Sequence, residues 1–191
     1  MTMQTPQPPP GALRAVLAAL DSEAGLRQPA ASVLRHGPGP LQPAHPLAVY
    51  VLERPGASPT EARRTGWRFL IKNGAGEFAA SAEVVETPAG HAFSHFTAGP
   101  YLDSTLRALR QAWQLAQAAH SRQQPRLLSM PGHYATALWL HGPTASEDLI
   151  IPLAPAPVGV TAHRVYPAAE LLAALDHSPV AAPAPALLGG S

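Results

Sequence analysis

Proline sets the strongest limit on what this chain can fold into. The chain has 23 prolines, which cluster at residues 6–10, 29–46, 152–157 and 179–185. Because proline fixes φ and has no backbone N–H, helices and central strands are expected between these clusters. We therefore predict a disordered tail at 1–10, a single domain at 11–178 with a flexible loop at 28–46, and a second disordered tail at 179–191.

Three segments have the spacing of an amphipathic helix. The first is 11–22, and the last is 167–177, which carries three leucines. The clearest is 100–121, where Pro100 suits the first helical position and Pro125 follows the end. Its apolar stripe contains Leu102, Leu106, Leu109, Trp113 and Ala116.

The remaining apolar runs predict five strands, at 47–54, 66–73, 77–86, 134–141 and 147–153. Asn73-Gly74 is a hairpin signal between the second and third strands, whereas 87–99 is expected to be irregular. The fold class is therefore α+β, with the order α-β-β-β-α-β-β-α. Short links predict a mainly antiparallel five-stranded sheet with helices packed on one face. Both faces of 47–54 are apolar, which favours a homodimer.

The amino-acid composition disfavours several classes of function. Thirteen basic and 12 acidic residues nearly cancel, which disfavours binding to nucleic acid or to an acidic membrane. The chain has no cysteine, no signal-peptide pattern and no long apolar segment. We expect a soluble, cytoplasmic protein, and the preference for Ala, Pro and Arg over Lys suggests a GC-rich bacterial genome.

His91 and His95 form a pair with i, i+4 spacing. On a helix they could hold a metal together. The glycines around them indicate extended structure instead, in which such residues lie about 13 Å apart and cannot share one ion. We predict no metal site here and take both as surface or partly buried side chains.

His133 and Tyr134 follow a Met-Pro-Gly turn at the start of a strand. Loops often carry function, so this turn is a candidate ligand site. The simpler interpretation is that the turn only reverses the chain and that Tyr134 packs. No GxSxG, GxxxxGK[ST] or GxGxxG motif occurs, so we predict no catalytic residue and no cofactor.

The three tryptophans, Trp67, Trp113 and Trp139, all lie on apolar stripes. We predict that they pack in the core. A tryptophan that proved to be exposed would instead indicate a partner site.

Two stretches, LLSMPGHYATALWLHG at 127–142 and EDLIIPLAPAP at 147–157, resemble segments of uncharacterised bacterial proteins. This resemblance implies no activity. The element order also resembles that of the type III secretion chaperone-like fold, whose members bind partner proteins; that resemblance implies a chaperone-like role.

These observations favour a non-catalytic protein-interaction module, such as an adaptor, a small chaperone or an accessory subunit. Its partner is expected to be another protein, with no nucleic acid or membrane involved. The alternative is a small-molecule-binding protein or small enzyme with a pocket near His91, His95, His133 and Tyr134.

Overall fold

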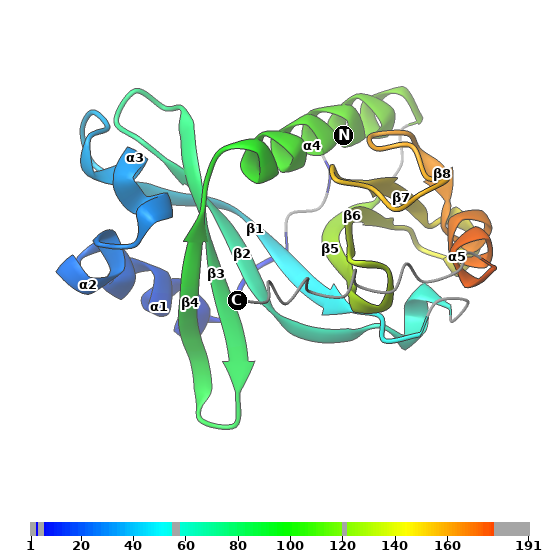
Figure 1. The fold of residues 1–191 in the computed structure, drawn as a ribbon, viewed down its shortest axis with the longest axis horizontal. Coiled ribbons are helices and arrows are strands. Elements are labelled where there is room, and N and C mark those ends of the chain that lie inside the picture. The colour runs from blue at the N-terminus through cyan, green and yellow to red at the C-terminus, as the bar shows by residue number, and fades with distance from the viewer. Residues whose placement is uncertain (1–2, 4–5, 55–57, 120–121, 178–191) are drawn as a thin grey trace, which may run out of the picture.

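A computed structural model describes residues 3, 6–54, 58–119 and 122–177. Within this part the chain is α+β, as predicted, and its strands form one mixed, eight-stranded sheet in the order β4-β3-β2-β1-β5-β6-β7-β8 (Figure 1). The predicted tail at 179–191 and residues 1, 2, 4 and 5 of the predicted tail at 1–10 lie outside the described residues.

The sheet consists of two antiparallel halves. The first half contains β1 (Gln42–Val51), β2 (Arg63–Lys72), β3 (Phe78–Thr87) and β4 (Gly90–Thr97). The second contains β5 (Gln124–Met130), β6 (Ala135–His141), β7 (Leu149–Pro152) and β8 (Tyr166–Pro167). A parallel ladder joins the halves, because residues 48–51 of β1 pair with residues 126–129 of β5.

The sheet is mainly antiparallel, as predicted, but the predicted number of five strands and their order were wrong. The prediction missed β4, which is an edge strand with polar and partly exposed side chains and so lacks a clear apolar alternation. It also missed β8, which is only two residues long, and β5, because Pro125 is equally a signal for the end of the preceding helix. Pro125 lies just before the ladder to β1 begins at Arg126, so its missing N–H interrupts no bond of that ladder.

The hairpin of β2 and β3 was predicted correctly, and the turn shows why. The Asn73 side-chain oxygen accepts hydrogen bonds from the backbone N–H groups of Ala75 and Glu77, both at 3.0 Å. A short polar side chain thus closes the turn locally.

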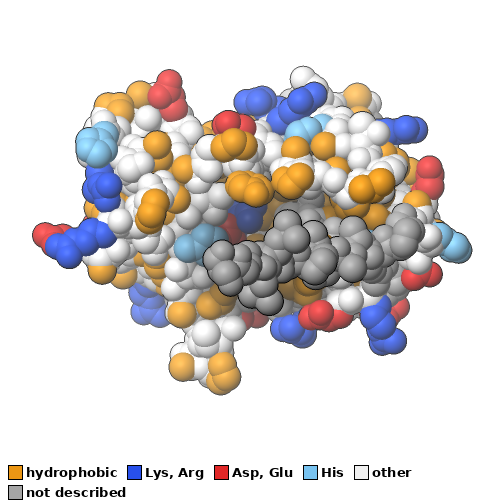
Figure 2. Space-filling model, viewed as in Figure 1, with side chains coloured by type: hydrophobic (Ala, Val, Ile, Leu, Met, Phe, Trp, Pro, Cys, Tyr) orange, Lys and Arg blue, Asp and Glu red, His pale blue; other side chains and the backbone are white. Residues whose placement is uncertain are grey.

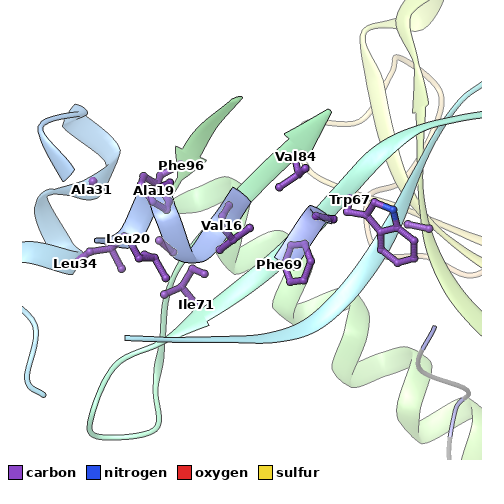
Figure 3. Close-up of a cluster of buried hydrophobic side chains, with 14 residues drawn as sticks. Val16, Ala19, Leu20, Ala31, Leu34, Trp67, Phe69, Ile71, Val84 and Phe96 are labelled. Carbon is purple, nitrogen blue, oxygen red and sulfur yellow. The ribbon is translucent and has the colours of Figure 1, made fainter. Parts of the chain in front are cut away.

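One face of the first half is covered by α1 (Pro10–Leu20), α2 (Glu23–Leu26) and α3 (Ser32–Arg35). Figure 3 shows Val16, Ala19 and Leu20 of α1 pointing at aromatic and aliphatic residues of the sheet, including Phe69 and Ile71. The segment 28–46, for which we predicted a flexible loop, contains the short helix η1 (Pro29–Ala31), α3 and the start of β1. Pro29 opens η1, and Pro43 and Pro46 lie in β1, whereas Pro38 and Pro40 lie in the link between α3 and β1.

On the second half of the sheet, the face that α1 covers on the first half is covered by α5 (Ala168–Asp176), whose Leu171, Leu172 and Leu175 are buried.

A buried carboxylate, that of Asp148, lies next to Trp139 in this half of the sheet, and Asp148 is 1% exposed. Its carboxylate accepts hydrogen bonds from the indole N–H of Trp139 at 2.9 Å and from the backbone N–H of Gly142 at 2.8 Å. The Nδ1 atom of His141 lies 3.2 Å from the same carboxylate.

The opposite face is covered by α4 (Pro100–Ala119), so the helices lie on both faces and not on one as predicted. The helix approaches the sheet through Ala108, Ala112 and Ala116, which are at most 2% exposed. Leu47 packs against α4, while its neighbour Ala48 packs on the α1 side. Both faces of β1 are thus covered within one chain, and the argument for a homodimer from an open apolar face no longer applies.

None of the helices in the described part of the chain is long and apolar enough to cross a membrane. Basic and acidic side chains alternate around the outline of the molecule (Figure 2), as the nearly balanced charge predicts. Basic side chains also lie along the upper edge, where α4 is seen in Figure 1.

Candidate functional site

A β-bulge near the start of β1 forms one wall of the candidate site. Ala44 pairs with Leu70 and Leu47 pairs with Arg68, so β1 has one more residue than β2 between these pairs. His45 lies in the bulge and has a left-handed backbone with φ of 44°. Bulges bend a strand and redirect side chains, and this one places the imidazole on the side of α4.

The imidazole of His45 lies between two aromatic rings. Its centroid is 5.5 Å from that of Phe78 on β3 and 5.5 Å from that of Trp113 on α4, both in edge-to-face orientation. Burial lowers the pKa of His45, and the nearby Lys72 ammonium lowers it further. Both causes favour the neutral imidazole, which suits an apolar site.

The close approach of α4 leaves its larger side chains at the flank of the helix–sheet interface. Trp67 and Trp139 are 3% and 2% exposed, as predicted for core residues, but Trp113 is 47% exposed. The prediction that all three tryptophans pack in the core was therefore wrong for Trp113. The reason is the alanine stripe, which takes the place facing the sheet.

Between α4 and the strands lies a cavity of about 370 Å³, which we call the α4 pocket. Its large apolar lining residues are Leu47, Leu70, Phe78, Leu106, Leu109 and Trp113. Met3 forms part of its wall and packs against the buried cluster beneath α4. His45, Arg110 and Gln117 supply polar groups. The pocket thus combines an apolar interior with a few polar positions, which is the usual character of a binding site.

The predicted candidates His91 and His95 lie on β4, at the edge of the sheet. The Nε2 atom of His91 is 4.0 Å from a carboxylate oxygen of Glu86, and its imidazole lies beside Gly11 of α1. The Nδ1 atom of His95 is 3.0 Å from the hydroxyl of Ser94. Both histidines are therefore on an extended strand. Among the described residues, no group of three or more His, Asp or Glu side chains could hold a metal ion.

The other two predicted candidates lie at the turn between β5 and β6. His133 ends the short helix η3 (Pro131–His133), and Tyr134 follows with a left-handed backbone, φ 50°. Tyr134 is 72% exposed and lines a second cavity of about 280 Å³, which we call the Tyr134 pocket. Arg68 and Tyr101 also line it.

The sheet order separates the two pairs of candidates. Four strands lie between β4, which carries His91 and His95, and β6, which begins just after Tyr134. Of the four residues, Tyr134 contributes to the Tyr134 pocket, whereas the α4 pocket is built from other side chains. No local pattern in the sequence indicates these side chains, because the bulge at His45 and the exposed position of Trp113 depend on contacts between distant segments.

The structure also joins Ser104 and His163, which the sequence analysis did not connect. The Ser104 hydroxyl is 2.8 Å from Nε2 of His163 and accepts a hydrogen bond from the Ala154 backbone N–H, also at 2.8 Å. A serine–histidine contact is the geometry of an activated nucleophile. Here the hydroxyl oxygen already accepts the hydrogen bond from the Ala154 backbone, and Ser104 is only 5% exposed, so a substrate has little access to it. The contact therefore anchors the chain around Ala154 to α4.

Comparison of the chain with protein-family models, with curated proteins and with solved structures gives no match.

Proposed function

We propose that this chain is a non-catalytic protein-interaction module, an adaptor, small chaperone or accessory subunit, that binds an apolar side chain of a partner protein in the α4 pocket. The observation that carries the proposal is the half-exposed Trp113 at an apolar cavity of about 370 Å³. Large aromatic side chains beside pockets are the residues that most often dominate the energy of protein interfaces.

The surroundings of Trp113 support this role. The edge-to-face contact with His45 and the packing of α4 on the sheet hold the indole in place before a partner arrives. A preformed aromatic surface loses little conformational entropy on binding. Met3 already packs at the pocket, which supports the view that the pocket accepts an apolar side chain.

The test is affinity capture from native lysate with the full chain, followed by affinity measurements on the identified partner. The Trp113→Ala variant is expected to lose at least about tenfold in affinity, as is typical when an interface hot spot is truncated. The Tyr134→Ala variant is the matched control, because it removes another exposed aromatic ring away from the α4 pocket. Equal binding by both variants and the parent chain would reject the proposal.

A second candidate function, small-molecule binding, is favoured by the Tyr134 pocket. Tyr101 and Tyr134 are 62% and 72% exposed at its rim. The guanidinium of Arg68 donates to the Thr105 hydroxyl at 3.4 Å and pairs with Glu83. These groups offer both stacking surfaces and hydrogen-bond donors. Ligand screening by thermal shift tests this candidate, and it predicts hits that the Tyr134→Ala variant loses.

A further inference from the structure

We infer that the partner segment that binds in the α4 pocket carries acidic residues next to its apolar side chain. This inference rests on the proposed function and specifies the chemistry of the partner. The charges around the pocket carry this inference. Arg110 lines the pocket from α4. Lys72 on β2 is not a lining residue, but its ammonium lies next to the ring of Phe78, which is one. None of the described residues that line the pocket is acidic.

The two cations lie on different walls. The Lys72 ammonium is 5.1 Å from the centre of the Phe78 ring, and Phe78 lines the pocket from the sheet side. Arg110 is an exposed residue of the helix wall. An extended segment with its apolar side chain between these walls would therefore place neighbouring residues close to both positive charges.

Neither cation is neutralised within the described part of the chain. The ion pairs there involve other basic residues, namely Arg27, Arg64, Arg68, His91 and His141. Glu77 precedes Phe78 in sequence, but its carboxylate accepts a hydrogen bond from the Asn73 side chain at 3.3 Å in the hairpin turn. Lys72 and Arg110 are thus free to meet carboxylates of a partner, which would complement the local potential.

Two features favour a polypeptide over a small amphipathic anion. The wall of the pocket already includes an apolar side chain of a polypeptide, that of Met3. The half-exposed Trp113 offers contact surface beyond the cavity itself, which a protein partner would cover. A fatty-acid anion is therefore treated as the competing outcome of the test.

The experiment compares two hexapeptides with blocked ends on the full chain, by isothermal titration calorimetry. One peptide has a Met-Leu centre with two aspartates on each side, and its partner peptide has asparagine at those four positions. Because aspartate and asparagine have nearly the same shape, the comparison isolates charge. The aspartate peptide is expected to bind about fivefold more tightly at low salt, from two partly exposed ion pairs. High salt should reduce the difference.

Variants of the two cations complete the test. Arg110→Gln and Lys72→Gln should each reduce the preference for the aspartate peptide, whereas Arg107→Gln, an exposed position on α4 outside the pocket lining, should leave it unchanged. Trp113→Ala should weaken both peptides. Equal affinity for the two peptides, or no binding of either, would overturn the inference.

The experiments distinguish failure of this inference from failure of the proposed function. If the captured partner binds through Trp113 while the peptides show no preference for charge, the interaction module stands and the acidic partner is wrong. If Trp113→Ala binds both the partner and the peptides normally, the α4 pocket is not the interface and both proposals fall. Binding of dodecanoate through Trp113 without binding of either peptide would replace the polypeptide with a small amphipathic anion.

Discussion

The imidazole of His45 meets the indole of Trp113 edge to face, with ring centroids 5.5 Å apart and an angle of 62° between the planes. One ring comes from a bulge in β1 and the other from α4, so the contact links the two walls of the α4 pocket. The state of this contact depends on the charge of the imidazole.

The first prediction is that acid destabilises the protein through His45. Burial and Lys72 lower its pKa in the folded state below the ordinary value of 6.5. As pH falls below about 6.5, the unfolded chain therefore binds a proton that the folded chain excludes, and the free energy of unfolding decreases until the folded pKa is reached.

Urea unfolding between neutral and mildly acidic pH measures this effect. The His45→Asn variant keeps a residue that tolerates the left-handed backbone, and it should show a smaller loss of stability across the same pH window. An identical pH dependence in the variant and the parent chain would show that His45 does not contribute.

The second prediction concerns the close approach of α4 to the sheet. Ala112 is 0% exposed, so Ala112→Leu forces extra volume into a packed interface and should lower the free energy of unfolding by about 1–3 kcal/mol. Ala118→Leu is the matched control, because Ala118 is exposed on the same helix. Chemical denaturation of both variants makes the comparison, and similar stabilities would argue against tight packing at Ala112.

The third prediction concerns the buried carboxylate of Asp148. Asp148→Ala leaves the indole N–H of Trp139 and the backbone N–H of Gly142 without their acceptor. The expected loss is about 3 kcal/mol, from two buried donors left unsatisfied. Thermal and urea unfolding measure it, with Asp176→Ala on the exposed side of α5 as the control. A loss no larger than that of the control contradicts the assigned role.

The fourth prediction concerns Gly66 in β2. A Cβ atom at this position would lie 2.0 Å from the carbonyl oxygen of Val84, and backbone atoms cannot move aside cheaply. Gly66→Ala should therefore cost about 2 kcal/mol or more, or prevent folding. Gly132→Ala, where a Cβ atom would have no neighbour within 4 Å, should be tolerated. Expression level, circular dichroism and unfolding midpoints distinguish the two variants.

The parts of the fold that depend on local signals were predictable from the sequence. The long helix follows from its leucine spacing, and the hairpin of β2 and β3 follows from Asn73-Gly74. Strand β5 was missed because Pro125 is ambiguous until the start of the ladder with β1 is known. The parallel pairing itself joins segments far apart in sequence, which no local pattern encodes.

The candidate site was less predictable. The helical stripe placed Trp113 on the buried side, but Ala108, Ala112 and Ala116 occupy the closest contact with the sheet. A one-residue bulge then decides where His45 points. The predicted candidates at His91, His95, His133 and Tyr134 were chosen from chain neighbours, and the strand order separates the two pairs.

The parallel ladder between β1 and β5 has a consequence for the order of events during folding. Each antiparallel half pairs strands that are close in sequence, whereas this ladder joins two strands that have β2, β3, β4 and α4 between them in the chain, so we expect it to form later. Helix α4 packs on residues of both halves, such as Leu47 and Leu138. Because Pro125 of β5 also lines the α4 pocket, we expect a nascent chain to complete this pocket only after β5 has joined the sheet.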